Sequence, residues 1–182
     1  MMDGADSYRR FLDGDESAFD ELIDLYFGSL TLFANRYTQN IHDAEDIALD
    51  TLTELLIHRH RYRFGTSLRA YLFAIARNKS LNFLRHRDKF RCVSADEAEA
   101  DLADRRSLED ELIADERLRA LNDALATLSE DMRTAVHLVY FEDMTYHDAA
   151  KVMKKTEKQV DNLLYRARNA LRVKLEKGGF TL

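Results

Sequence analysis

The sequence contains no proline, only six glycines and a single cysteine, Cys92. One cysteine excludes an internal disulfide and any cysteine-cluster zinc site. The six histidines show no metal-ligand spacing of the HExxH kind, so we expect neither a metal centre nor another cofactor. Because proline and glycine are scarce, the boundaries between elements have to be found from charge and hydrophobic periodicity.

Long apolar runs are also missing. No stretch of about 18 consecutive apolar residues occurs, so no transmembrane helix is predicted and we expect no membrane insertion. Residues 1–16 lack the apolar core of a signal peptide, so by elimination we expect a cytoplasmic location. No nucleophile–base pair and no phosphate-binding loop occurs, so the sequence does not predict an enzyme.

The net charge of −6 is unfavourable for a nucleic-acid-binding protein, but it is unevenly distributed. Residues 1–91 carry 13 basic and 14 acidic side chains, residues 92–116 carry 2 and 10, and residues 117–182 carry 12 and 9. The acidity is therefore concentrated in the middle of the chain, whereas the C-terminal third is basic.

Helical periodicity runs through most of the chain, and no window keeps the alternation of a strand. We therefore predict an all-α protein of two small helical domains, residues 1–91 and 111–182, joined by an acidic linker, residues 92–110. The first clear helix follows Gly14, with Asp15 as its N-cap. Its broad apolar face comprises Phe19, Leu22, Ile23, Phe27, Leu30 and Phe33.

A second helix begins near His42 and Asp43, and its acidic first turn suits the helix dipole. One side of this helix repeats Ala44, Ile47, Thr51 and Leu55. Towards the end of the acidic segment, helical periodicity resumes at Ser107 with Leu108, Leu112, Leu118, Leu121 and Leu125. The C-terminal third then has the pattern of several short helices.

The stretch between residues 61 and 91 mixes aromatic and basic side chains. Gly65 interrupts the helical pattern, and Thr66 or Ser67 can cap the next helix, one stripe of which carries Leu68, Leu72, Ile75 and Lys79. Aromatic and basic side chains are the kinds that stack on bases and follow a phosphate backbone. Part of the aromatic set has a plainer explanation, since Phe73 and Phe83 can simply pack in a core.

The strongest local pattern lies at residues 144–175. Thr145 and Asp148 resemble a capping box ahead of a short helix that packs through Ala149, Ala150, Val152 and Met153. A three-residue turn follows, and Thr156 then caps a longer helix, with Gln159 three residues later. The longer helix keeps its apolar residues on one side: Val160, Leu164, Ala167, Leu171 and Leu175.

A short helix, a tight turn and a long helix with a polar face make a helix-turn-helix, whose second helix enters the DNA major groove. The polar face carries Lys158, Asn162, Tyr165 and Asn169, flanked by Arg166. The alternative is an ordinary helical hairpin with a solvated basic face. Glycine is common in such turns, and Lys154, which stands there instead, would adopt the turn conformation at some cost.

Several segments, in their order and spacing, resemble the extracytoplasmic-function (ECF) branch of the sigma-70 family of RNA polymerase sigma factors. GDESAFDELIDLYFGSL at residues 14–30 is similar to the family's first helix, and DAEDIALDTLTELL at residues 43–56 to a helix of sigma region 2. FGTSLRAYLFAIARNKSLNFLR at residues 64–85 resembles the segment that captures the downstream promoter element. LSEDMRTAVHLVYFEDMTYHDAAKVM at residues 128–153, with the helix after it, resembles region 4.

The resemblance implies a non-catalytic subunit that directs core RNA polymerase to specific promoters and helps to melt them. Its partners would be core polymerase and promoter DNA, and the family also admits an anti-sigma factor. The carboxylates that would dock on polymerase are Asp43, Glu45, Asp46, Asp50 and Glu54. Such a face suits a basic partner, although helix-dipole capping accounts equally well for Asp43.

The resemblance also assigns DNA contacts. For the downstream element they are Phe64, Thr66, Ser67, Tyr71, Arg77, Asn78, Asn82 and Arg85, with Asn78 and the loop at residues 65–67 as the best candidates for reading bases. Tyr71 stands where the family usually has tryptophan. For the upstream element they are Thr156, Lys158, Gln159, Asn162, Arg166 and Arg168. Asp161 and Leu163 stand where the family more often has basic residues, so we expect an unusual preference there.

Two other functions fit parts of this pattern. A transcription regulator would use the helix-turn-helix alone, and would need neither the acidic helix nor the aromatic and basic segment. An adaptor that mimics a sigma factor to sequester its antagonist would not need the basic residues of the second helix, which are Lys158, Arg166, Arg168 and Arg172. The sigma-factor interpretation accounts for both halves of the chain.

Overall fold

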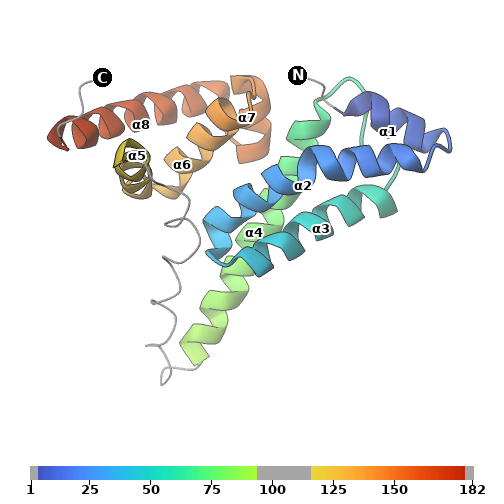
Figure 1. Cartoon of the computed structure of the whole chain (residues 1–182), viewed down its shortest axis with the longest axis horizontal. Helices are drawn as coiled ribbons and strands as arrows, with labels where there is room; N and C mark the ends of the chain where they lie inside the picture. The colour runs from blue at the N-terminus through green and yellow to red at the C-terminus, as the bar shows by residue number, and fades with distance from the viewer. Residues whose placement is uncertain (1–3, 94–115, 179–182) are drawn as a thin grey trace. The chain divides into compact units, whose positions relative to one another are not determined.

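The computed structural model describes residues 4–93 and 116–178, and the chain divides into two units between Glu99 and Ala100. The first unit contains α1 (Ala5–Leu12), α2 (Ser17–Thr38), α3 (Ile41–Ile57) and α4 (Leu68–Val93) (Figure 1). The second contains α5 (Glu116–Ala126), α6 (Glu130–Val136), the π-helical turn η2 (His137–Phe141), α7 (Tyr146–Met153) and α8 (Glu157–Lys177). In these two ranges the only strand-like pairing is an isolated bridge between Phe64 and Thr66, so the all-α prediction is confirmed.

The predicted linker, residues 92–110, lies outside the described residues except for Cys92 and Val93, which end α4. The predicted helix start at Ser107 lies outside them as well, and α5 is described from Glu116 onward. Within the two described ranges, no helix is both long enough and apolar enough to cross a membrane.

The first unit is a bundle in which α2 packs against α1, α3 and α4, and α3 packs against α4. Phe33 and Phe73 are fully buried and meet edge to face, with 5.1 Å between ring centroids. This geometry adds about 1 kcal/mol to the stabilisation that burial alone supplies. The predicted inner side of α3 is confirmed, since all four of its residues are buried. Phe73 is a core residue, as the plainer explanation predicted.

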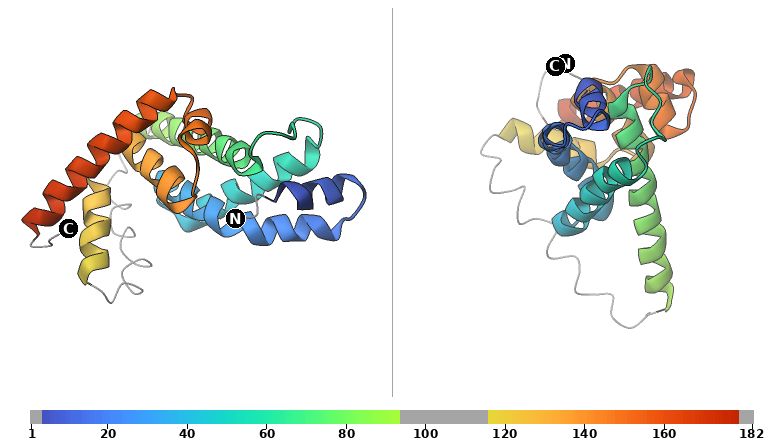
Figure 2. Two further views of the ribbon diagram at one scale, coloured as in Figure 1. Left: turned by 90° about the horizontal axis from the view of Figure 1, so that it is seen from above. Right: turned by 90° about the vertical axis from the view of Figure 1, so that its right-hand side faces the viewer.

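The sequence does not predict α1, a short helix that folds back along α2 (Figure 2). Only two of its side chains, Tyr8 and Phe11, are buried, which is too few to make a clear periodic pattern. The start of α2 also differs from the prediction, because the N-cap position is Glu16 and not Asp15. The Asp15 carboxylate still accepts a hydrogen bond of 2.6 Å from the Ser17 hydroxyl. That bond and the Ser17 and Ala18 backbone N–H groups lower the pKa of Asp15.

The second unit is organised around α8, which packs against α5, α6 and α7. The predicted apolar side of α8 is confirmed at Val160, Leu164 and Ala167, which are fully buried, whereas Leu171 and Leu175 are half-buried. The π-helical turn was not predicted. A buried polar pair joins its two ends, since Nε2 of His137, the first residue of the turn, lies 3.3 Å from Oε1 of Glu142, the residue after it.

Candidate nucleic-acid interface

The segment between α3 and α4 is a tight loop built on Gly65, whose φ of 96° is reached at little cost only by glycine. Residues on either side of Gly65 form the isolated bridge, and the Thr66 hydroxyl donates to the Arg63 carbonyl at 2.9 Å. Ser67 caps α4 by accepting a hydrogen bond of 3.1 Å from the Ala70 N–H. Thr66 and Ser67 therefore shape the loop, whatever contacts they make with DNA.

The loop rests on a cluster of aromatic rings. Tyr62 is buried, and its hydroxyl donates to the Thr66 carbonyl. The Tyr62 ring lies 5.2 Å from Phe64 and 5.5 Å from Tyr71, so it joins the loop to the first turn of α4. The sequence pattern gave Tyr62 no role, because nothing in the neighbouring residues indicates its burial.

Two of these rings face outward enough to meet a base. Phe64 is 40% exposed, and Tyr71 is half-buried. Burial raises the pKa of the Tyr71 hydroxyl above its ordinary value, and the nearby Glu54 carboxylate raises it further. Tyr71 is therefore a neutral hydrogen-bond donor at physiological pH. Phe83, by contrast, packs against a core cluster of Ala34, Ala44 and Ile47.

The candidate residues on α4 do not all share one face. At about 100° per residue, Tyr71, Asn78, Asn82 and Arg85 fall on one stripe, while Arg77 lies about 100° around the helix from Asn78. Asn78, Asn82 and Arg85 are exposed, and an Arg85 guanidinium N–H donates to the Asn82 amide oxygen at 2.9 Å. The structure thus supplies a stripe of one ring, two amides and one cation.

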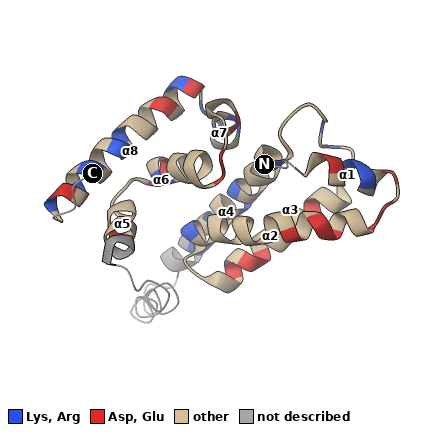
Figure 3. Ribbon diagram, turned by 45° about the horizontal axis from the view of Figure 1, so that its top comes forward, with Lys and Arg blue, Asp and Glu red and all other residues tan. Residues whose placement is uncertain are grey.

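The acidic candidates lie on α3, which begins after Asn40. The Asn40 side chain accepts from the backbone N–H groups of His42 and Asp43, at 2.9 and 3.3 Å. Asp43, Asp46, Asp50 and Glu54 follow one side of the helix, whereas Glu45 lies well over 90° away at about 100° per residue. Figure 3 shows acidic residues in red along α3.

Part of the acidic side is already neutralised inside the unit. Nζ of Lys79, on α4, lies 3.3 Å from Glu54 and 3.6 Å from Asp50, and Arg61 lies 4.0 Å from Glu54. Asp46 and Asp50 are the exposed carboxylates, and the exposed apolar residues Leu49 and Ile57 lie beside them. The surface is therefore mixed acidic and apolar, which the sequence pattern alone did not indicate.

In the second unit, α7, the turn and α8 form the predicted helix-turn-helix. Thr145 caps α7 by accepting from the Asp148 N–H at 3.1 Å. Thr156 and Gln159 form a capping box at the start of α8, with hydrogen bonds of 3.2 and 2.8 Å. Lys154 has a φ of 54°, the left-handed conformation that the missing glycine implied, and this conformation costs a side-chain-bearing residue about 1 kcal/mol.

The capping box changes what Thr156 and Gln159 can offer to DNA. The Thr156 hydroxyl oxygen and the Gln159 amide oxygen are both used as acceptors within the box. The Gln159 amide N–H₂ and the Thr156 hydroxyl proton remain as donors. The two residues therefore position α8 first, and any base contact has to be made through their donors.

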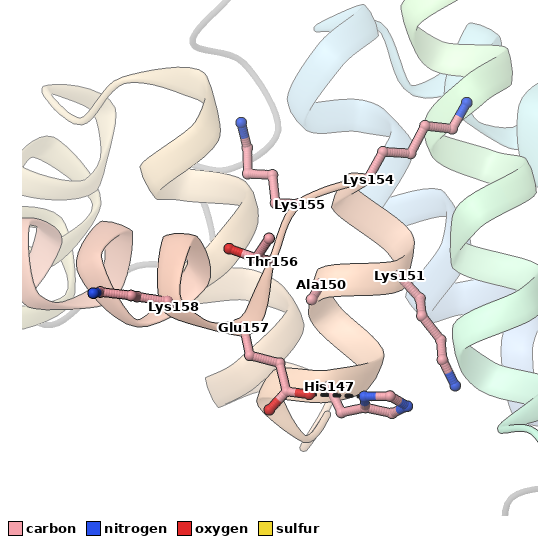
Figure 4. A pocket seen from close by; sticks show the side chains of 8 residues that line it. All are labelled: His147, Ala150, Lys151, Lys154, Lys155, Thr156, Glu157 and Lys158. Atoms are coloured by element: carbon pink, nitrogen blue, oxygen red, sulfur yellow. Dashed lines mark hydrogen bonds and ion pairs between the residues drawn. The ribbon is translucent and has the colours of Figure 1, made fainter.

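Cations surround the turn of the helix-turn-helix. Figure 4 shows Lys151, Lys154, Lys155 and Lys158 around a hollow that His147 and Glu157 also line. Two of the lysines face carboxylates, with Lys155 3.0 Å from Asp131 and Lys151 3.8 Å from Asp148. His147 Nδ1 lies 2.8 Å from a Glu157 carboxylate oxygen.

The outer face of α8 carries Lys158, Asn162, Tyr165 and Arg166, all of them exposed. Tyr165 is 62% exposed although it is a large ring. Arg168 lies about 120° around the helix from Asn162 at about 100° per residue, so it flanks the face. Asp161 is exposed as well, and Leu163 lines a shallow groove with Lys155, Gln159, Asn162 and Arg166.

Two family models match the chain, the one for sigma-70 region 2 over residues 22–90 and the one for sigma-70 region 4 over residues 118–171. The RNA polymerase sigma factor CarQ of Myxococcus xanthus is 32% identical over 139 residues, which cover 76% of this chain and 78% of CarQ. The ECF RNA polymerase sigma factor SigM of Bacillus subtilis is 26% identical over 159 residues, 87% of this chain and 96% of SigM.

A solved structure agrees. The sigma factor RpoE of Bartonella quintana, in complex with the anti-sigma factor NepR, is similar with a TM-score of 0.72 and 26% identity, over 87% of this chain and 96% of RpoE. The region 2 match contains the acidic helix and the aromatic loop, and the region 4 match contains α7, the turn and most of α8. This chain belongs to the ECF branch of the sigma-70 family, the RNA polymerase subunits that direct transcription initiation at specific promoters.

Proposed function

We propose that this chain binds core RNA polymerase through its first unit and promoter DNA through both units. The observation that carries the proposal is the combination, in one chain, of an acidic and apolar α3, an aromatic loop and a helix-turn-helix with an outer face rich in cations. Residues 1–91 and 111–182 would be the two working domains, and residues 92–110 the linker between them. Catalysis would remain with the polymerase, and we expect the protein to act in the cytoplasm without enzymatic activity of its own.

For polymerase docking we propose Asp46 and Asp50 as the principal carboxylates, with Asp43, Glu45 and Glu54 in weaker roles. Asp46 and Asp50 are exposed, and Leu49 and Ile57 beside them are 51% and 66% exposed. Apolar residues supply binding energy and carboxylates steer a basic partner. Lys79 lies 3.3 Å from Glu54 and 3.6 Å from Asp50, but the Asp50 side chain is 71% exposed and that of Glu54 only 31%, so Asp50 is the more open of the two to a partner.

For the downstream element we propose that a displaced strand runs along the stripe of α4 and reaches the loop. Tyr71 and Phe64 would stack on bases, Asn78 and Asn82 would hydrogen bond to base edges, and Arg85 would meet phosphate. Thr66 and Ser67 would hold the loop in shape. Arg77 lies off the stripe, so we assign it a phosphate contact at its margin.

For the upstream element we propose that α8 enters the major groove. Lys158, Asn162 and Arg166 on its outer face would contact base edges and phosphates. Arg168 would meet phosphate at the flank, and Thr156 and Gln159 would act through the donors that the capping box leaves. Because RpoE of Bartonella quintana was solved with an anti-sigma factor, we propose an anti-sigma factor as a partner of this chain too.

The test is reconstitution of transcription from genomic DNA with core polymerase and the full chain. We expect transcripts that start at specific sites, whereas core polymerase alone should give none. The double variant Asp46→Lys, Asp50→Lys should lower affinity for core polymerase about tenfold or more, because each carboxylate facing a cation contributes about 1 kcal/mol.

The matched control is Asp20→Lys, Asp24→Lys, two exposed carboxylates with the same spacing on α2. It should leave core binding within about twofold of wild type. A chain that fails to co-elute with core polymerase would contradict the proposal at its first step. A chain that binds an anti-sigma factor but neither core polymerase nor DNA would be the adaptor.

A further inference from the structure

The helix α1 lies outside residues 22–90, the part of the chain that matches sigma-70 region 2, yet it is tied to the base-reading loop. The Tyr8 hydroxyl donates to the carbonyls of Leu55 and Arg59, at 3.3 and 3.0 Å, near the end of α3. The Tyr8 ring lies 5.7 Å from Tyr62 and 6.2 Å from Phe64. The position of α1 is therefore set relative to the loop and not only to α2.

On the outside of this contact, Arg9 covers an exposed ring. Its guanidinium carbon lies 4.9 Å from the centroid of Phe64, which is 40% exposed. A guanidinium over an aromatic face is attractive in itself, and guanidinium planes are surfaces on which bases stack. Arg9 therefore covers one face of Phe64, and a base that approaches from that side would stack on the guanidinium, with the ring behind it.

The charge of Arg9 is little compensated. Its ion pair with Asp6 is 3.6 Å long, and the two side chains are 60% and 96% exposed, so water and salt screen it. The neighbouring Arg10 differs, because it pairs with Asp15 at 3.0 Å and with Glu21 on α2. These two carboxylates compensate the charge of Arg10, whereas Arg9 offers its cation to a ligand.

We propose that Arg9 and Phe64 form a binding site for one nucleotide of single-stranded promoter DNA, with the base stacked on the guanidinium and ring and the phosphate facing the Arg9 charge. The inference rests on the proposed function and extends the downstream interface to α1. It makes the N-terminal helix part of the DNA-binding surface. The sequence pattern did not single out the basic and aromatic residues of α1.

The experiment uses holoenzyme, assembled from core polymerase and the full chain, and a single-stranded oligonucleotide. The oligonucleotide carries the non-template sequence of a promoter found by the reconstitution above, with 2-aminopurine at one position at a time. We expect quenching of the fluorescent base at one position, and loss of that quenching in both Arg9→Ala and Phe64→Ala. Affinity should fall about five- to tenfold in Arg9→Ala, with a salt dependence weaker by about one phosphate contact.

Two further variants separate binding from structure. Arg9→Lys keeps the charge without the planar group, so it should restore the salt dependence but not the quenching. Arg10→Ala removes the same charge one residue away and should leave both quantities within about twofold of wild type. Thermal unfolding of each variant checks that the first unit remains folded.

Different outcomes test the proposed function and the inference about α1. If no holoenzyme forms or no specific transcript appears, the proposed function fails. If holoenzyme forms and transcribes but Arg9→Ala binds the single strand as wild type does, or binds it more tightly because Arg9 only shields the ring, the inference about α1 is wrong. Equal losses in Arg9→Ala and Arg10→Ala would also overturn it, because general electrostatics would then explain both.

Discussion

The second unit sets up its candidate DNA-binding helix through neighbours along the chain, whereas the first unit holds the aromatic loop at residues 62–67 through residues distant in sequence. Thr145 caps α7 and Thr156 caps α8, because each hydroxyl oxygen accepts a hydrogen bond from the backbone N–H three residues later. Tyr8, by contrast, reaches carbonyls 47 and 51 residues away. A capped helix keeps its shape through hydrogen bonds between near neighbours, whereas a loop keeps a fixed shape only when other elements hold it from several sides.

The largest expected change in stability comes from a core substitution, which tests whether the two units are stable independently of each other. Phe73→Ala removes a fully buried ring that packs on Phe33, which should destabilise the first unit by about 3–5 kcal/mol. Hydrogen exchange measured by mass spectrometry should show faster exchange in α2, α3 and α4, with α6 to α8 unchanged.

Leu164→Ala is the reciprocal variant, since Leu164 is fully buried in the second unit. It should reverse the pattern of exchange at a cost of about 2–5 kcal/mol. If either variant accelerates exchange equally in both units, the two units do not fold independently and the comparison between them loses its basis.

A smaller loss of stability is expected when Tyr8 loses its hydrogen bonds to carbonyls distant in sequence. Tyr8→Phe leaves the Leu55 and Arg59 carbonyls without the hydroxyl, which should cost about 1–2 kcal/mol. Burial raises the pKa of Tyr8 to about 12. Because the folded state then holds its proton more tightly than the unfolded state, wild-type stability should fall as the pH rises from about 10 to 12.

Urea unfolding at both ends of this pH window measures the effect, and Tyr8→Phe should lose less stability across it than wild type. Tyr165→Phe is the control, since Tyr165 is 62% exposed and its substitution should alter stability by less than about 0.5 kcal/mol. An identical pH dependence in wild type and Tyr8→Phe would show that another group governs it.

The smallest expected change in stability concerns the turn of the second unit, which is held by residues near one another in the chain. Lys154→Gly removes the strain of a left-handed residue in the turn of the helix-turn-helix and should stabilise the second unit by about 1 kcal/mol. The measurement is urea unfolding without DNA. Gln39→Gly is the matched variant, because Gln39 ends α2 with a φ of 56°. A loss of stability in either variant would mean that the side chain contributes more than the backbone conformation costs.

Much of the fold could be predicted because its signals are local. The inner side of α3, the capping box at Thr156 and the conformation of Lys154 each follow from residues within one or two helical turns. The exceptions are short or irregular. The sequence did not predict α1, which buries only two side chains, or the π-helical turn, which has no local signature in this chain.

The candidate site was only partly predictable. The five acidic residues of α3 look equivalent in sequence, yet Lys79, on another helix, pairs with Asp50 and Glu54. The aromatic residues near Gly65 also look alike, but Tyr62 is buried and Phe64 exposed. These distinctions depend on which helices meet, and no residue pattern within one segment contains that information.

The sequence by itself determined the longer helices, the helix-turn-helix and the resemblance to the family, because caps, periodicity and turn residues act within a few positions along the chain. Only the tertiary structure decided how α1 lies against the loop, which carboxylates are neutralised and which rings face outward. Those outcomes are set by packing, hydrogen bonds and ion pairs between residues far apart in the chain, such as Tyr8 with Arg59 and Lys79 with Glu54. These contacts stabilise the protein only after the helices that carry them have packed together.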